Sequence, residues 1–159
     1  MWAQVIRWFY LDERFSIFAG MGLIHVKIGL TNTVDASNAH TGLIDKGKVR
    51  RMDVQVLVDS GATLLCINEN IALELGLTQS RESMITLADG SKKACKIVGP
   101  VTINFLTRST VVEAIVLPGD AQPLLGALPM EGMDVIIDPL TQTLGVPPDR
   151  PYMANYITA

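Results

Sequence analysis

The stretch Val54–Asn68 places one carboxylate where it could carry out chemistry. It reads V-Q-V-L-V-D-S-G-A-T-L-L-C-I-N, so an apolar strand runs into Asp59-Ser60-Gly61 and a second apolar run follows. A carboxylate in apolar surroundings is costly unless it has a task such as acid–base catalysis. Two such carboxylates that share one proton can hydrolyse a peptide bond, because one activates a water and the other donates to the carbonyl oxygen.

Asp59 supplies only half of such a pair. The chain has 159 residues, which is too short for two lobes that each carry a catalytic Asp in this setting. We therefore expect the second Asp59 to come from a second copy across a two-fold axis. Gly61 would let the backbones approach closely, and the Ser60 hydroxyl could hydrogen-bond across the axis. The alternative is a simple strand-end turn in which Asp59 caps backbone N–H groups.

Period-two alternation predicts most of the elements that must position this loop. Asn68 is expected to cap one short helix over 69–75, with Gly76 just beyond its end. Residues 31–47 lack clear periodicity and are predicted to form a loop or a wide hairpin connection. Many short strands with close turns predict an all-β domain, barrel-like or a compact sandwich. Strands are expected at 22–30, 49–58, 84–87, 94–105 (kinked at Gly99-Pro100), 110–117, 134–138 and 143–146, and a single turn at 129–133.

The composition argues against several function classes. Charged residues make up 18% and the net charge is −3, with Lys and Arg scattered, so no nucleic-acid partner is expected. Cys66 and Cys95 lie in apolar stretches and are expected to be reduced, buried thiols. His25 and His40 are isolated, and His25 falls on the solvent face of its strand. We expect neither a metal nor a cofactor, because no cluster has ligand spacing.

The two ends are expected to lie outside the folded core. Residues 1–20 hold both Trp residues, but charges at 12–14 argue against a signal peptide or an integral membrane segment. They are an appendage, or Met21 is the functional start; an amphipathic helix that docks on the domain, a partner or a lipid surface is an alternative. The domain is expected at 21–146, with an extended, Pro-rich tail at 147–159. A standalone domain without a signal suggests a cytoplasmic protein.

Two motifs resemble the retropepsin-like (retroviral-type) aspartic proteases, and in particular their bacterial single-domain type. Asp59-Ser60-Gly61-Ala62, with an apolar strand before it and T-L-L-C-I-N after it, is similar to the active-site loop of that family. A second family motif is two apolar residues followed by Gly, crossing behind the catalytic loop. Leu124-Leu125-Gly126 matches it. The resemblance implies that Asp59, Ser60 and Gly61 are catalytic and that Ala62 and the second motif support the loop.

The resemblance also implies a flap that closes over the substrate. The hairpin at 87–92 lies between the two motifs, and Asp89-Gly90 at its tip suits a primed turn. The substrate-covering residues would be Ala88, Asp89, Gly90 and Ser91.

Taken together, the resemblance implies a closed, barrel-like acid-protease half-domain, all-β with one short helix. It would act without a cofactor, as a homodimeric aspartic endopeptidase on polypeptide substrates. Two departures concern the dimer: the family's acidic residue and Arg, which form an ion pair that buttresses it, are replaced by Thr63 and Ala127. The alternative is a catalytically silent dimerisation or peptide-binding module that binds an extended peptide by strand addition. The carboxylates of Glu131, Asp134 and Asp138 are predicted to be exposed turn charges.

Overall fold

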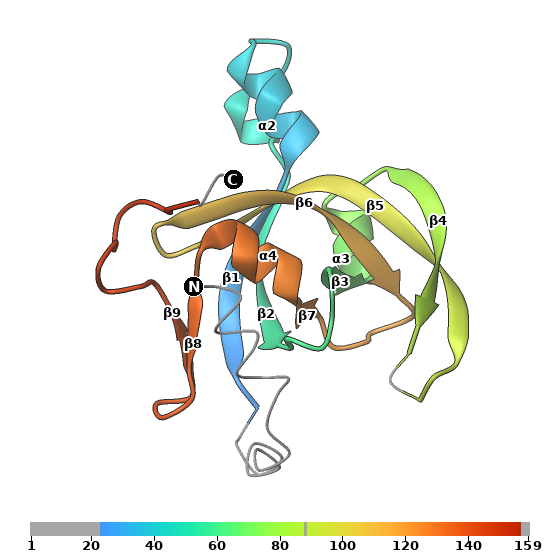
Figure 1. The fold of residues 1–159 in the computed structure, drawn as a ribbon. Helices are drawn as coiled ribbons and strands as arrows, with labels where there is room; N and C mark the ends of the chain where they lie inside the picture. Colours follow the sequence, from blue (N-terminus) through green and yellow to red (C-terminus); the bar gives the residue numbers. More distant parts are fainter. Residues whose placement is uncertain (1–22, 88, 157–159) are drawn as a thin grey trace.

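The computed structural model describes residues 23–87 and 89–156 (Figure 1). The stretch 1–20, expected to be an appendage, and Ala88 of the expected flap lie outside these residues. The helices are α2 (Thr33–His40), α3 (Glu69–Glu74) and α4 (Ala127–Met133), with a 3₁₀ turn, η2 (Lys46–Lys48). The strands are β1 (His25–Asn32), β2 (Arg51–Val58), β3 (Leu65–Asn68), β4 (Gln79–Thr86), β5 (Lys92–Phe105), β6 (Arg108–Leu117), β7 (Leu124–Leu125), β8 (Ile136–Asp138) and β9 (Thr143–Gly145).

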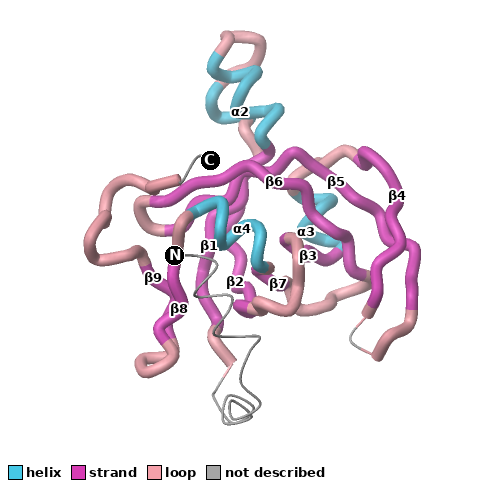
Figure 2. Tube along the Cα trace, in the orientation of Figure 1, coloured by secondary structure: helices cyan, strands magenta, loops and turns pink. Residues whose placement is uncertain are grey.

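Seven of these strands form one mixed sheet in the order β1-β2-β7-β3-β6-β5-β4. β1 also pairs with β5, from Gly29 opposite Asn104 to Asn32 opposite Val101, so the pairings close into a ring with β4 outside it. β8 and β9 form a separate two-stranded sheet. The predicted all-β, retropepsin-like fold class is confirmed (Figure 2).

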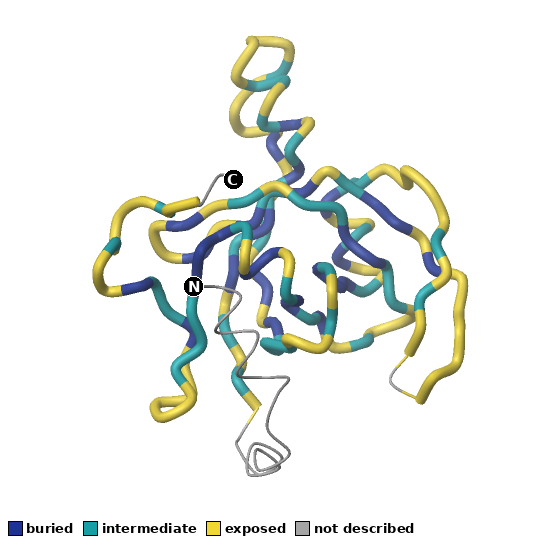
Figure 3. The backbone as a smooth tube through the Cα atoms, viewed as in Figure 1, coloured by how far each residue is buried: buried dark blue, intermediate teal, exposed yellow. Residues whose placement is uncertain are grey.

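Alternate residues of the strands build the main core. The exposed fraction is 1% or less at Ile28, Leu30, Val56, Val101 and Ile103, and their strand neighbours face outward. Each such side chain contributes about 1.5–3 kcal/mol through burial. Figure 3 shows the buried segments gathered in the middle of the molecule, with exposed residues at the hairpin tips and on α2. His25 is exposed, as the alternation predicts.

β5 bends at Gly99-Pro100, as predicted, and the bend divides its pairing. The bond is cis, Gly99 has a φ of 145°, and the register with β6 shifts between Val98 and Val101. A β-carbon on Gly99 would lie 3.2 Å from the carbonyl oxygen of Val112, so a glycine suits this close approach. On its other edge, β5 pairs with β4 before the bend and with β1 after it.

Helix α2 corrects the prediction of a loop or hairpin connection over 31–47. It projects from one end of the molecule (Figure 1). Its one buried residue is Asp35, so the sequence has no apolar periodicity there that would predict a helix. Polar contacts define it instead. The Asn32 side chain caps it by accepting from Asp35 N at 3.1 Å, and Asp35 binds Arg50 through two side-chain hydrogen bonds of 2.7 and 2.9 Å.

Helix α3 begins at the predicted residue and ends one residue before the predicted end, with Leu75 as its C-cap. The Asn68 side chain accepts from Ile71 N at 3.0 Å, and Gly76 follows the helix with a φ of 57°. No helix among the described residues is both long and apolar enough to cross a lipid bilayer.

Candidate active site

Asp59 lies directly after β2, at the start of a tight turn. The alternation of β2 ends at Val58, and Asp59 N then donates to Leu125 O at 3.0 Å. The turn is closed by Ala62 N, which donates to Asp59 O at 3.1 Å, and by Gly61 N, which donates to Asp59 Oδ1 at 2.9 Å. This is an Asx-type turn, which Asp favours because its short side chain reaches the backbone two residues on. Asp59 is half-buried and Ser60 and Gly61 are exposed.

The first-motif glycine leaves room for the carboxylate. A β-carbon on Gly61 would lie 3.1 Å from Asp59 Oδ1, a tight contact that the carboxylate must relieve by a small shift. An alanine there would therefore shift the carboxylate slightly.

The second motif packs directly behind the Asp59 turn. β7 lies parallel to β2, with Leu125 opposite Val58, and antiparallel to β3, with Leu124 opposite Cys66. A β-carbon on Gly126 would lie 2.4 Å from Leu64 O. The chain can cross here only because residue 126 has no side chain. Leu124-Leu125-Gly126 and Asp59 thus come together, although they are far apart in the sequence.

The N-terminus of α4 also holds the loop. Ala127 N donates to Ala62 O at 2.8 Å, and Leu128 N donates to Thr63 O at 3.0 Å. These N–H groups belong to the first turn of a helix and would otherwise lack partners. Thr63 and Ala127 stand at the positions where the resemblance implies a charged pair. Here backbone hydrogen bonds connect these two segments instead. The one sequence feature that points to this contact between α4 and the loop is Gly126, which directly precedes the helix.

The hairpin between β4 and β5 is present, but its turn is not the primed two-residue turn that the sequence predicts: the paired residues Leu87 and Ser91 enclose a three-residue loop that ends at Gly90. Leu87 N donates to Ser91 O at 2.8 Å, and Gly90 N donates to Leu87 O at 2.9 Å, with a φ of 81° at Gly90. Asp89 Oδ1 accepts from the hydroxyl of Ser91 at 2.6 Å, and this bond lowers the pKa of the Asp89 carboxyl. None of the hydrogen bonds among the described residues joins this hairpin to the Asp59 turn, so its role as a flap stays a prediction.

An apolar cluster lies beside the Asp59 turn. Cys66 and Cys95 are free and buried, as predicted. Burial, and next the charge of Asp59, raises the pKa of the Cys66 thiol to about 11. The buried members of the cluster are Cys66, Cys95, Ile97 and Ile115, and the partly buried ones are Leu64, Ile85, Leu117 and Leu124.

Asp134 is not an exposed turn charge, so that prediction is wrong. Its exposed fraction is 0%, and Arg150 donates to it at 2.6 and 2.9 Å. The partner comes from sixteen residues later, which is why the local pattern does not reveal it. Glu131 is exposed, as predicted, and Asp138 is a half-buried turn residue that accepts from Leu140 N at 2.9 Å.

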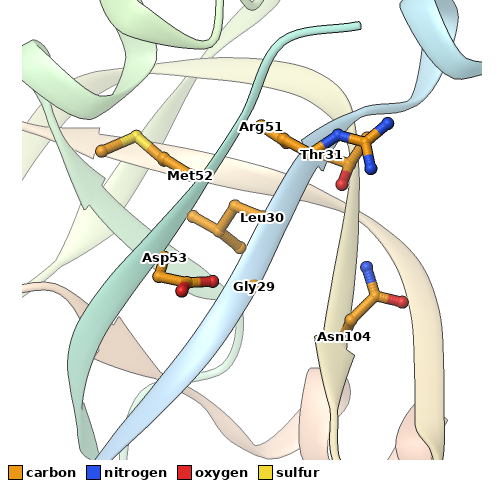
Figure 4. A pocket seen from close by; sticks show the side chains of 7 residues that line it. All are labelled: Gly29, Leu30, Thr31, Arg51, Met52, Asp53 and Asn104. Carbon is orange, nitrogen blue, oxygen red and sulfur yellow. The ribbon is translucent and has the colours of Figure 1, made fainter. Parts of the chain in front are cut away.

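A hollow of about 460 Å³ lies elsewhere on the molecule (Figure 4). Arg51 and Asp53 of β2 and Asn104 of β5 line it, around the bare backbone of Gly29. Asp53 is six residues before Asp59 on an extended strand, so the two are roughly 20 Å apart. The hollow is therefore separate from the Asp59 turn. Among the described residues, no group of three or more His, Cys, Asp or Glu side chains could hold a metal ion.

Comparison with known families agrees with this geometry. Residues 46–130 match the model of a family described as "gag-polyprotein putative aspartyl protease". The matched part is more than half of the chain and contains Asp59, the β4–β5 hairpin and Gly126. A search of curated proteins found no match to the chain.

Proposed function

Since the chain belongs to the retropepsin-like aspartic protease family, we propose that it is an aspartic endopeptidase that acts as a homodimer. The observation that carries the proposal is the packing of Gly126 against Leu64 O, which holds the Asp59 turn on β7 and α4. Such support fits a carboxylate whose position matters, because catalytic groups must be held close to one geometry.

The proposed reaction uses one Asp59 from each subunit. One carboxylate takes a proton from a water, whose oxygen attacks the carbonyl carbon of the scissile bond. The other, protonated, donates to the carbonyl oxygen. The tetrahedral intermediate then collapses: one of its hydroxyl groups returns a proton to the second carboxylate as the carbonyl re-forms, the C–N bond breaks, and the nitrogen leaves with the proton that the first carboxylate took from the water. Two carboxylates that face each other across the two-fold axis titrate as a coupled pair, so the pair holds one shared proton over a range of pH.

The neighbouring residues have supporting roles in this proposal. The Gly61 amide donates to Asp59 Oδ1 and fixes the direction of the carboxylate. The Ser60 hydroxyl is exposed and is available to bond to the second subunit. An extended polypeptide would lie between the Asp59 pair and the hairpin at 88–91, against the apolar cluster that contains Leu64 and Leu124.

The decisive variant is Asp59→Asn, which removes the ionisable group and keeps the shape. Cleavage of a mixture of unfolded proteins is expected to disappear, while the circular dichroism spectrum and the solution mass remain unchanged. Asp53→Asn is the matched control, because Asp53 lies on β2, the strand that leads into Asp59, is exposed and pairs with Lys27 on the surface. Cleavage that persists in Asp59→Asn would refute the mechanism.

A statine-type transition-state mimic tests the silent-module alternative. The enzyme is expected to bind it at a pH where the carboxylate pair shares one proton, and Asp59→Asn is expected to bind it far more weakly. Tight binding of extended peptides without binding of the mimic at any pH would favour a peptide-binding module.

A further inference from the structure

Helix α4 is held at both ends. Its N-terminal residues, Ala127 and Leu128, donate to the carbonyl oxygens of the Asp59 loop, as described above. Its C-cap is Asp134, in the left-handed conformation with a φ of 51°. The helix has seven residues, so about 10 Å separates the two ends. A contact at Asp134 is therefore only one short helix away from the loop that carries Asp59.

The C-terminal segment 149–156, here called the C-terminal clamp, holds the Asp134 end. Arg150 Nε and Nη2 donate to Asp134 Oδ2 and Oδ1 at 2.6 and 2.9 Å, a two-point charge-assisted contact. Asn155 N donates to Asp134 Oδ2 at 3.1 Å, and the Tyr156 hydroxyl donates to Gly132 O at 2.5 Å. Three residues of the clamp thus contact the last turn of α4.

The clamp also binds the β5–β6 hairpin. The Thr107 hydroxyl donates to Pro151 O at 2.6 Å, and Arg108 Nη2 donates to Arg150 O at 2.6 Å. Arg108 is 3% exposed, and its Nη2 lies 3.7 Å from Asp134 Oδ2. The clamp therefore joins α4 to a hairpin that belongs to the main sheet.

The charges of the Asp134–Arg150 ion pair are largely buried, so the loss of either one has a large effect on this contact. The Asp134 and Arg150 side chains are 1% and 17% exposed. Removing one partner of a buried ion pair is far more disruptive than removing an exposed one, because the remaining charge is poorly solvated. α4 also fits closely against β6, since a β-carbon on Gly132 would lie 2.6 Å from Thr110 Oγ1. The helix therefore packs closely on β6 at Gly132.

We propose that Arg150, acting through Asp134 and α4, is a positioning residue for Asp59. The proposal rests on the proposed protease function. Thr63 and Ala127 carry no charge, and at this end α4 supports the loop through the backbone hydrogen bonds of Ala127 and Leu128 and the close packing of Gly126. The ion pair at the other end keeps α4 in the place where those bonds form. A displacement of about 1 Å in a catalytic group can lower the rate about a hundredfold.

The first test does not depend on enzyme activity. Amide hydrogen exchange is measured at Asp59, Ala127 and Leu128 in the full chain and in Arg150→Gln. Their protection is expected to fall at least about tenfold more than that of the β2 core amides. Unchanged protection, or a fall equal to that of the core amides, would overturn the proposal.

The chain provides a matched control for this variant. Arg50 binds Asp35 through Nε and Nη2 at 2.7 and 2.9 Å, and a backbone N–H donates to the same carboxylate at 3.1 Å, so the geometry resembles that at Asp134. This pair lies at the base of α2. Arg50→Gln is expected to leave the protection of Ala127 and Leu128 unchanged relative to the core, whereas an equal loss in both variants would refute a specific role for Arg150.

The second test uses the pH dependence of kcat with a peptide substrate. The separation of the two apparent pKa values of a carboxylate pair depends on how close the carboxylates are. Arg150→Gln is expected to lower kcat about tenfold to a hundredfold. It is also expected to bring the two apparent pKa values of the pair closer together, so that the pH profile of kcat narrows from both sides. Arg150→Lys should restore part of both effects. A lower kcat with the same profile width indicates a purely structural role and would overturn the proposal. Absence of peptidase activity in the wild type would refute the proposed function instead. The hydrogen-exchange experiment would still show whether Arg150 holds α4 and the Asp59 loop in place.

Discussion

The α-carbon of Gly126 faces the carbonyl oxygen of Leu64 so closely that a β-carbon would lie 2.4 Å from it, and 2.7 Å from Ala62 O. Both oxygens belong to backbone of the Asp59 loop, which cannot move aside as a flexible side chain can. The crossing of β7 behind the loop therefore depends on a glycine at this position.

Gly126→Ala is expected to destabilise the domain by about 2 kcal/mol or more, because overpacking against backbone forces both segments apart. Urea denaturation measures the loss. Gly145→Ala is the control, since a β-carbon there has no neighbour within 4 Å, and a change below about 0.5 kcal/mol is expected. Equal stability of the two variants would show that the crossing tolerates a side chain.

Mixed dimers test whether each subunit supplies one carboxylate. If subunits exchange freely, an equimolar mixture of wild type and Asp59→Asn at fixed total concentration should keep about a quarter of the wild-type activity, because only dimers with two wild-type subunits are active. A monomeric enzyme would keep about half. The measurement is the initial rate of peptide cleavage after subunit exchange, and a linear dependence on the wild-type fraction would argue against the shared site.

The ion pair at the base of α2 predicts a pH-dependent stability. The hydrogen bonds from Arg50 hold the pKa of the Asp35 carboxyl below its ordinary value, against the opposing effect of burial. The folded state therefore binds a proton less readily than the unfolded state, and the stabilisation is present above the unfolded pKa of about 4 and lost as the pH falls below it.

The variant for this prediction is Asp35→Asn. Its melting temperature is expected to lie below that of the wild type at pH 7, and the difference should shrink steadily from about pH 4 downward. Thermal unfolding at a series of pH values measures it. A difference that stays constant down to pH 2 would show that the charge on Asp35 is not what stabilises the fold.

The Cys66 thiol is expected to be unreactive in the folded protein. Burial and the Asp59 charge raise its pKa to about 11, so roughly one thiol in a thousand is ionised at pH 8, and only the thiolate reacts. In a Cys95→Ala background, labelling by an aromatic disulfide at pH 8 should be slow in the native state and fast in urea. Asp59→Asn should increase the native rate, because it removes a negative charge nearby. Rapid native labelling at pH 8 would contradict the raised pKa.

Local pattern was sufficient for much of the fold and for the first motif. Alternation located the strands that bury Leu30, Val56 and Ile103, and capping chemistry located α3 from Asn68. The bend at Gly99-Pro100 was predictable because both residues restrict the backbone in known ways. α2 was not predictable by these means, since it lacks an apolar face. The ion pair between Asp35 and Arg50 holds α2 in place, and Arg50 lies fifteen residues later in the chain.

The sequence by itself determined that Asp59 follows an apolar strand and that a glycine ends the second apolar motif. Only the tertiary structure decided what surrounds them: β7 between β2 and β3, and α4 with its N–H groups on the Asp59 loop. It also decided that Asp134 is buried against Arg150. The reason is that periodicity and turn chemistry act over a few residues, whereas close backbone crossings and buried ion pairs join segments whose spacing in the chain carries no signal.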